Sequence, residues 1–392
     1  MKLNGKLCAT RRKFLDALAP RIYFHFNFLF YFRNFSKAYS MFKSIKRISV
    51  SLFLGANLCT VLLLWLCVAV TFVSPDVIPR LSLLTLAFPV FLVANLLFVL
   101  FWLIFYARLV WVPVVGMLAV GGYILDYCPL RLGSAGQGDG SGITVVSYNV
   151  GGMTTEERRA ELLSILRSAD ADIVCLQEVA THFLGNHQKW LDSTSYRYLQ
   201  AGSVAILSRH PFLSDTIHIS FPTRSNRSIA CWIDFDGDSL LVINNHLESN
   251  HLSEEEKDEY TSTIIDPHRQ TIKSSSRMLV GKLSEATGYR GAQADSVCAF
   301  IDRNAGHSII LCGDLNETPV SYVYQQFDRR LLSAYREAGL GPGFSYTRRS
   351  FPVRIDHLFH SGHWTCTSCG IDRTVSASDH YPLTVRLCKK VR

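Results

Sequence analysis

Ser308-Ile309-Ile310-Leu311-Cys312-Gly313-Asp314 is an apolar run that stops at a carboxylate. Similar runs over 143–148, 172–177 and 240–245 stop at Asn149, Glu178 and His246. Near-continuous apolar runs of this length predict strands that are buried on both faces. Polar groups at the ends of such strands can meet on one rim of a sheet. We therefore expect a functional site where these strands end.

Helical patterns alternate with the predicted strands. They cover Thr155 to Ser168 and much of Gln270 to Arg303. This alternation predicts an α/β sandwich in which helices cover sheets, and it fits an all-β barrel less well. The second helical pattern leaves two interpretations of Arg290 and Gln293 open. They either pack against the domain core or hold the loop that follows Asp314.

The composition indicates a membrane protein. Of the 392 residues, 48% are hydrophobic and 18% are charged, which excludes disordered and collagen-like classes. The net charge of +8 is concentrated in residues 1–47, which hold eleven Lys or Arg and one acid. The part from residue 133 onward is therefore about −3. The overall charge is no indication of nucleic-acid binding.

Three apolar runs predict a transmembrane region over 48–132. The runs 49–74 and 81–107 are uncharged and long enough to cross about 30 Å of hydrocarbon. The run 109–125 is shorter and contains Pro113 and three glycines, so it predicts either a third span or a buried core helix. A Gly- and Ser-rich stretch, 133–142, predicts a flexible linker to a domain at 143–388.

The number of spans decides the compartment of this domain. The basic segment 1–47 is expected to stay in the cytoplasm. Three spans would place the domain on the extracytoplasmic side of the cell membrane, whereas two would return it to the cytoplasm. We favour three spans and a multi-pass protein. Met41 precedes a short basic lead, so residues 1–40 are either an over-extended start or a stretch lying on the membrane surface.

Each polar residue at a strand end has an ordinary explanation as a turn residue or a helix cap. Six such sites in one domain, however, supply what phosphate-ester hydrolysis needs. A carboxylate such as Glu178 suits a hard divalent ion. Asp314 and Asn316 point to the same side if extended, and Asp356 can fix the tautomer of a histidine. Asp379-His380 places an acid beside an imidazole.

These residues lie in six short motifs. In chain order they are Ser147-Tyr148-Asn149-Val150, Gln177-Glu178-Val179, Asn245-His246-Leu247-Glu248, Gly313-Asp314-Leu315-Asn316-Glu317-Thr318-Pro319, Arg354-Ile355-Asp356 and Ser378-Asp379-His380-Tyr381-Pro382. The set resembles the ordered motifs of the endonuclease/exonuclease/phosphatase superfamily, over about Ile143 to Leu387. The resemblance implies a four-layered α/β sandwich with a Mg²⁺ or Mn²⁺ site at one end.

The resemblance also implies a metal site and a set of catalytic residues. Glu178 would bind the metal, with Asn149 and Asp379 in support. Asp314 would position and activate the attacking water, and Asn316 would bind phosphate beside it.

Two histidines complete the implied site. His380 would contact the scissile phosphate, oriented by Asp356. His246 matches a histidine that protonates a leaving group in pancreatic deoxyribonuclease and the neutral sphingomyelinases. Abasic-site endonucleases have a tyrosine at that position, which counts against abasic repair.

The substrate is less defined by the sequence. Pro352-Val353-Arg354-Ile355-Asp356 stands where inositol polyphosphate 5-phosphatases carry a proline-tryptophan-cysteine-aspartate-arginine signature, so specific inositide recognition loses support. We favour a phosphoesterase anchored in the lipid bilayer that hydrolyses phosphodiesters, either nucleic acid or phospholipid head groups. The alternatives are a phosphomonoesterase of the same fold and a non-catalytic membrane binding module. No specific protein partner is indicated.

Overall fold

The computed structural model describes residues 41–130, 141–152, 156–168, 170–181, 184, 191, 194–252, 256, 272–348, 351–375 and 378–390. The predictions for residues 1–40, and for most of the linker at 133–142, lie outside these residues.

Two six-stranded sheets form the centre of the C-terminal domain. The first has the order β13-β14-β1-β2-β4-β3 and the second β5-β6-β7-β8-β12-β9. The first sheet comprises β1 (Gly142–Asn149), β2 (Ile173–Gln177), β3 (Arg197–Ala201), β4 (Val204–Ser208), β13 (Trp364–Ile371) and β14 (Leu383–Lys389). The second comprises β5 (Ile217–Ile219), β6 (Arg227–Phe235), β7 (Asp238–His246), β8 (Ser308–Asp314), β9 (Leu332–Ser333) and β12 (Asp356–His360). A separate hairpin is formed by β10 (Tyr346–Arg348) and β11 (Phe351–Val353).

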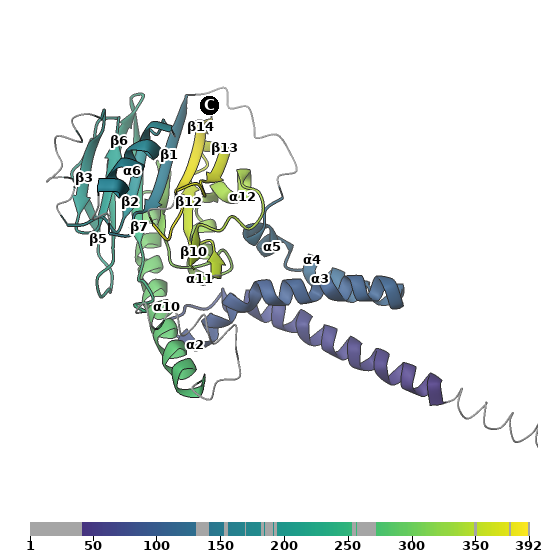
Figure 1. The fold of residues 1–392 in the computed structure, drawn as a ribbon. Coiled ribbons are helices and arrows are strands. Elements are labelled where there is room, and N and C mark those ends of the chain that lie inside the picture. The colour runs from purple at the N-terminus through teal and green to yellow at the C-terminus, as the bar shows by residue number, and fades with distance from the viewer. Residues whose placement is uncertain are drawn as a thin grey trace, which may run out of the picture.

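Helices cover the outer faces of the two sheets (Figure 1). On the first sheet, Leu162 and Ile165 of α6 (Glu156–Ser168) join a buried cluster with β1, β2 and β4. On the second sheet, α10 (Ile272–Arg303) and α11 (Tyr322–Asp328) bury apolar side chains against β7 and β8. A third buried cluster fills the space between the sheets, with α12 (Ala334–Ala338) at its edge. The order helix, sheet, sheet, helix confirms the predicted α/β sandwich.

The strand register brings the ends of four strands to one rim. β1 and β2 are parallel, with Asn149 opposite Gln177. β7 and β8 are also parallel, with His246 opposite Asp314. β12 runs antiparallel to β8 and places Asp356 opposite Asp314. Because parallel strands share the edge at which they end, residues far apart in the chain become neighbours there.

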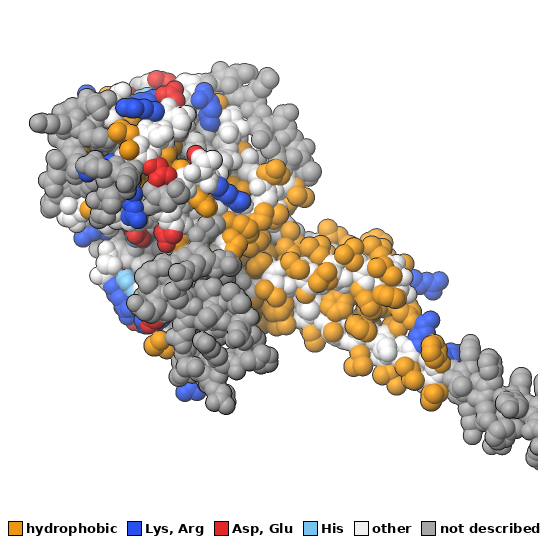
Figure 2. Space-filling view, viewed as in Figure 1, with side chains coloured by type: hydrophobic (Ala, Val, Ile, Leu, Met, Phe, Trp, Pro, Cys, Tyr) orange, Lys and Arg blue, Asp and Glu red, His pale blue; other side chains and the backbone are white. Residues whose placement is uncertain are grey.

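The N-terminal part is a group of apolar helices that projects from this domain (Figures 1 and 2). Two helical segments, Met41–Val70 and Pro79–Phe105, are long and apolar enough to cross a membrane. The second consists of α2 (Pro79–Ser82), η1 (Leu83–Ala87) and α3 (Phe88–Phe105). Asn57 links the two segments through its amide, which donates to Asn95 Oδ1 at 3.1 Å and accepts from Trp102 at 2.9 Å. Such buried amide bonds hold apolar helices together where lipid offers no competing partner.

The third apolar run forms a bent pair of short helical segments. It comprises η2 (Ala107–Leu109), α4 (Trp111–Leu118) and α5 (Gly121–Tyr127), with a bend of 69°. The bend falls directly before Gly121 and Gly122, and glycine is a poor helix former. The pair counts as a third crossing if it is one broken span.

Candidate active site

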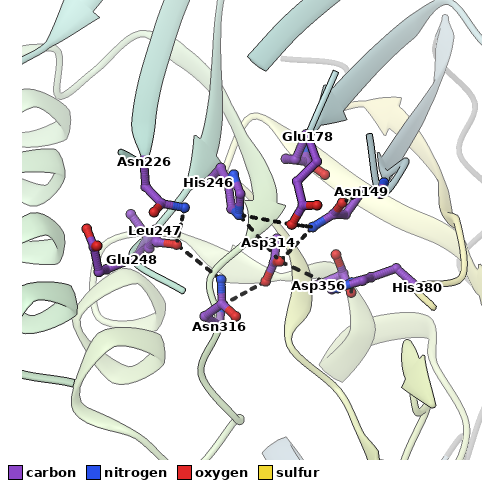
Figure 3. Close-up of polar contacts among 12 residues, drawn as sticks. Asn149, Glu178, Asn226, His246, Leu247, Glu248, Asp314, Asn316, Asp356 and His380 are labelled. Carbon is purple, nitrogen blue, oxygen red and sulfur yellow. Dashed lines mark hydrogen bonds and ion pairs between the residues drawn. The ribbon is translucent and has the colours of Figure 1, made fainter. Parts of the chain in front are cut away.

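Six of the predicted site residues meet at the rim where β1, β2, β7 and β8 end (Figure 3). Two clusters there have ligand atoms within 4.8 Å of one another: Glu178 with His246 and Asp314, and Asp314 with Asp356 and His380. Asp314 belongs to both clusters, and its side chain is 1% exposed. It is therefore the centre of the arrangement.

Asn149 connects the two sheets at this point. Its Nδ2 donates to Glu178 Oε1 and to Asp314 Oδ2, both at 3.0 Å. Its Oδ1 accepts the backbone N–H of Gly151 at 3.1 Å. In this orientation the amide holds two carboxylates from different sheets at one place. The Glu178 side chain is 42% exposed, so this carboxylate faces the open side of the rim.

Asp356, His380 and Asp314 form a line of acid, imidazole and acid. His380 Nδ1 lies 2.8 Å from Asp356 Oδ2, and His380 Nε2 lies 3.7 Å from Asp314 Oδ2. Burial opposes a charge on His380, but Asp356 and Asp314 outweigh it and raise its pKa to about 10. Burial raises the pKa of Asp314 to about 7, against the attraction of His380. The imidazole is thus a cation at neutral pH, held between two carboxyl groups.

Ser345 orients the Asp356 carboxylate that binds His380. The backbone N–H groups of Ile355 and Asp356 both donate to Ser345 Oγ at 3.1 Å. The hydroxyl proton of Ser345 must then point to Asp356 Oδ2, which lies at 2.7 Å. Since that oxygen is an acceptor from both sides, Nδ1 of His380 carries a proton and Nε2 faces Asp314. No pattern in the sequence singled out Ser345, which lies in a loop outside the matching motifs.

Tyr346 is a second neighbour that sequence reasoning missed. Its ring packs edge-on against the ring of His380, with centroids 4.9 Å apart. Burial, followed by the negative charge of Asp379, raises the pKa of its hydroxyl. Tyr346 therefore packs against the imidazole as a neutral phenol.

His246 is buried and faces both carboxylates. Its Nε2 lies 3.7 Å from Glu178 Oε1 and 3.9 Å from Asp314 Oδ2. Neither ring nitrogen has a hydrogen-bond partner among the described residues. Burial lowers its pKa, although the charge of Glu178 opposes this. A buried imidazole with free nitrogens at a rim of carboxylates is available to a further group.

The backbone that carries the site is strained at defined positions. Glu178 adopts a φ angle of 56°, which L-residues rarely adopt, whereas Asn316 at 52° is an asparagine, which tolerates this region. Gly313 has φ 135°, and a Cβ there would stand 1.9 Å from the carbonyl oxygen of Asn245. The glycine directly before Asp314 is thus required because β8 approaches the β7 backbone too closely for any side chain.

Asn316 and Asp379 lie beside these clusters. The backbone N–H of Asn316 donates to Asp314 Oδ1 at 2.8 Å, and its Nδ2 donates to the carbonyl of Leu247 at 3.1 Å. Asp379 belongs to neither cluster among the described residues. It lies next to Gly151, where a Cβ added to the glycine would stand 3.9 Å from Asp379 Oδ1.

Arg290 and Gln293 of α10 hold the loops of the rim. Arg290 donates to Glu317 Oε1 at 2.7 Å and to the carbonyl of Glu248 at 2.9 Å. Gln293 accepts the backbone N–H of Glu248 at 2.8 Å. Of the two interpretations left open by the sequence, the contact with Glu317 supports the one in which Arg290 holds the loop after Asp314.

The donor set fits a hard divalent cation. Glu178 and Asp314 offer carboxylate oxygens, and His246 offers an unpartnered nitrogen, all within 4.8 Å. Mg²⁺ takes one or two protein carboxylates and keeps several waters, which agrees with the exposed side of Glu178. The residues present therefore suit Mg²⁺ or Mn²⁺ better than a metal that needs thiolates.

A two-sheet α/β sandwich with this cluster at its rim defines a hydrolase fold of the nuclease and phosphatase type. Residues 146–380 match the model of the Endonuclease/Exonuclease/phosphatase family, and the chain belongs to this family. Residues 50–127 match a second model, described as a domain of unknown function, DUF8431. No curated protein matches the chain significantly.

Several solved structures are similar to part of the chain. The human Nocturnin catalytic domain with bound sulfate is 18% identical, covers 64% of this chain and 95% of its own, and has a TM-score of 0.48. A family member from Bacteroides thetaiotaomicron is 18% identical, with 64% and 100% covered and a TM-score of 0.45. D. rerio TDP2 complexed with a single-strand DNA product is 17% identical, with 63% and 99% covered and a TM-score of 0.44. At these identities we draw nothing about the substrate from them.

Proposed function

We propose that the protein is a membrane-anchored, divalent-metal-dependent hydrolase of phosphate esters. The observation that carries the proposal is the convergence of Glu178, His246 and His380 on Asp314, in two clusters that share this carboxylate. Displacement at phosphorus needs neutralised charge on the phosphate oxygens and a base for the attacking water, and carboxylates for a metal, a raised-pKa carboxyl group and an imidazolium can supply them.

The geometry supports a distinct role for each residue. Glu178 would hold Mg²⁺ or Mn²⁺, with Asn149 and Asp379 in support, and the bound ion would neutralise charge on the non-bridging oxygens. Asp314 would accept a proton from the attacking water, because burial raises the pKa of its carboxyl group to about 7 and makes it a stronger base than an exposed carboxylate.

The remaining residues act on the phosphate and the leaving group. His380 donates from Nε2 to a non-bridging oxygen, while Asp356 binds its Nδ1. His246 has a ring nitrogen without a partner among the described residues, and it would donate a hydrogen bond to the leaving oxygen. Asn316 holds Asp314 through its backbone N–H and lies beside the phosphate site.

We propose a phosphodiester as the preferred bond, in a nucleic acid or a phospholipid head group. A hydrogen-bond donor at the leaving oxygen assists an alkoxide or sugar oxygen of a diester, and His246 would supply it. Hydrolysis of a monoester in preference to a diester would make the protein a phosphomonoesterase of the same fold.

We further propose that the catalytic domain is extracytoplasmic and that the chain crosses the membrane three times. Lys46 lies near the start of the first helix, and its Nζ is 5.5 Å from the ring centroid of Tyr106, which follows α3. Both residues therefore mark the end of the helices that is remote from the domain. At the other end, Arg329 of the domain lies over the ring of Phe72 at 5.2 Å. The basic residues at the remote tip of the apolar helices (Figure 2) favour the cytoplasm for that end.

The test is hydrolysis by the full chain in detergent with Mg²⁺ or Mn²⁺. Bis(4-nitrophenyl) phosphate and 4-nitrophenyl phosphate serve as diester and monoester. We expect Glu178→Gln and His380→Asn to lose at least about 100-fold in kcat, since each removes a charge from the reacting centre. Glu285→Gln, the same change at an exposed ion pair with Arg224, is the matched control and stays near wild type. Hydrolysis that survives both site substitutions would refute the assignments.

A further inference from the structure

A buried acid stands at the end of the third apolar segment. Asp126 of α5 is 2% exposed. Its Oδ1 accepts from Arg336 Nη1 at 2.6 Å, and its Oδ2 accepts from Gln325 Nε2 at 3.0 Å. Both partners belong to the catalytic domain. The proposed mechanism uses none of these three residues.

Arg354 forms the second part of this contact. It is 3% exposed and donates to the carbonyl of Pro342 at 2.7 Å and to the backbone carbonyl of Asp126. Its guanidinium lies over the ring of Tyr335, 4.1 Å from the centroid. A buried guanidinium is costly unless its donors are bonded, and these two bonds satisfy Nη1 and Nη2, while Nε has no partner among the described residues. The backbone around Arg354 is therefore held where α5 meets the domain.

The two residues after Arg354 lead directly into the site. The carbonyl of Ile355 accepts the N–H of Leu315, the residue that follows Asp314, at 2.9 Å. Asp356 comes next and binds His380 at 2.8 Å. Three consecutive residues thus contact α5, the Asp314 loop and the catalytic imidazole in turn.

A second connection starts three residues after Asp126. The carbonyl of Pro129 accepts the N–H of Gly341 at 3.0 Å. The loop that begins at Gly341 ends at Ser345, whose hydroxyl binds Asp356 Oδ2 at 2.7 Å. Both connections from the end of α5 therefore converge on the same carboxylate oxygen, the one that orients His380.

We propose that Asp126 is a positioning residue for the hydrolysis, which docks α5 against Arg336 and Gln325 and thereby sets the place of Asp356 and His380. This proposal rests on the proposed function. Its physical basis is that a reacting group displaced by about 1 Å loses up to about 100-fold in rate. The apolar helices are on this view part of the catalytic architecture and not only a tether.

The matched comparison is another contact between the apolar helices and the domain. Arg329 lies over Phe72 and contacts none of the residues between Gly341 and Asp356 in the described interactions. Arg329→Ala weakens attachment without touching the two connections, whereas Asp126→Asn removes the charge that binds Arg336 and changes little in volume. A purely architectural role predicts the same outcome for both variants.

The experiment uses the full chain in detergent and measures kcat, KM, melting temperature and amide hydrogen exchange. We expect Asp126→Asn to lower kcat about 10-fold with KM unchanged, and to speed exchange at Gly341 and Ile355 while β1 stays protected. Arg329→Ala should leave kcat within about twofold. Equal kcat in Asp126→Asn and wild type, or equal losses in both variants, would overturn the proposal. If the wild-type chain hydrolyses neither ester, the proposed function fails. In that case, unchanged exchange at Gly341 and Ile355 in Asp126→Asn would refute the positioning role separately.

Discussion

Asp356→Asn tests the line of acid, imidazole and acid most directly. The substitution keeps the size of the side chain, and an amide oxygen in place of Oδ2 can still accept from Ser345 and His380. The amide nitrogen would occupy the place of Oδ1, which has no hydrogen-bond partner among the described residues. Only the negative charge beside the imidazole is removed.

The magnitude follows from the bond that changes. The contact between His380 Nδ1 and Asp356 Oδ2 is 2.8 Å long, and both side chains are buried. A buried hydrogen bond to a charged group contributes about 1.5–3 kcal/mol, roughly twice a neutral one. Because the amide keeps a neutral hydrogen bond, about half of this free energy, roughly 1–1.5 kcal/mol, is lost from the stabilisation of the imidazolium. That loss corresponds to about 5- to 13-fold in kcat.

The assay is the rate of diester hydrolysis at saturating Mg²⁺ and neutral pH. Asp302→Asn, at an exposed ion pair with Arg330, makes the same chemical change away from the rim and serves as the control. We expect KM to stay constant, because the charge acts on the transition state more than on the bound substrate. A kcat within about twofold of wild type, with an unchanged melting temperature, would refute the reasoning.

Three further predictions concern the metal, the backbone and acid stability. Mg²⁺ at about 100 times its Kd should stabilise the wild-type chain by about 2.7 kcal/mol in thermal unfolding. Glu178→Gln should abolish most of this stabilisation. Equal stabilisation of both proteins would show that Glu178 does not bind the metal. Gly313→Ala should destabilise the domain by on the order of 4 kcal/mol, because the added Cβ would stand 1.9 Å from the Asn245 carbonyl oxygen. Gly362→Ala is the control, since a Cβ added there has no atom within 4 Å. Similar melting temperatures for the two variants would contradict the clash. Burial lowers the pKa of His357 to about 3, below its ordinary value of 6.5, so protonation favours the unfolded chain. The stability that depends on neutral His357 is complete above pH 6.5 and falls toward pH 3. The unfolding free energy of His357→Gln should therefore depend less on pH over this window, and an identical dependence would show that His357 does not contribute.

The local pattern of residues was sufficient to predict the strands and helices and the set of reactive groups. Apolar runs that stop at Asn149, Glu178, His246 and Asp314 predict strands with polar ends, and the two sheets confirm the α/β sandwich. The side-chain types at each strand end are encoded locally. Parallel pairing then places these ends together, and the register forms the rim. The roles of the individual residues stay proposals that the substitutions above address.

The tertiary structure decided what no local pattern encodes. Ser345 has no motif of its own, and it became a partner of Asp356 only because the loop before β10 returns to the rim. The third apolar run bends, and its Asp126 meets Arg336, which lies 210 positions away in the chain. Contacts of this kind depend on the paths of loops and on the pairing of buried charges. Neither of these leaves a periodic pattern in the sequence. The chain order therefore specifies the groups at the rim, whereas their orientation and their connection to the apolar helices arise only when distant segments pack.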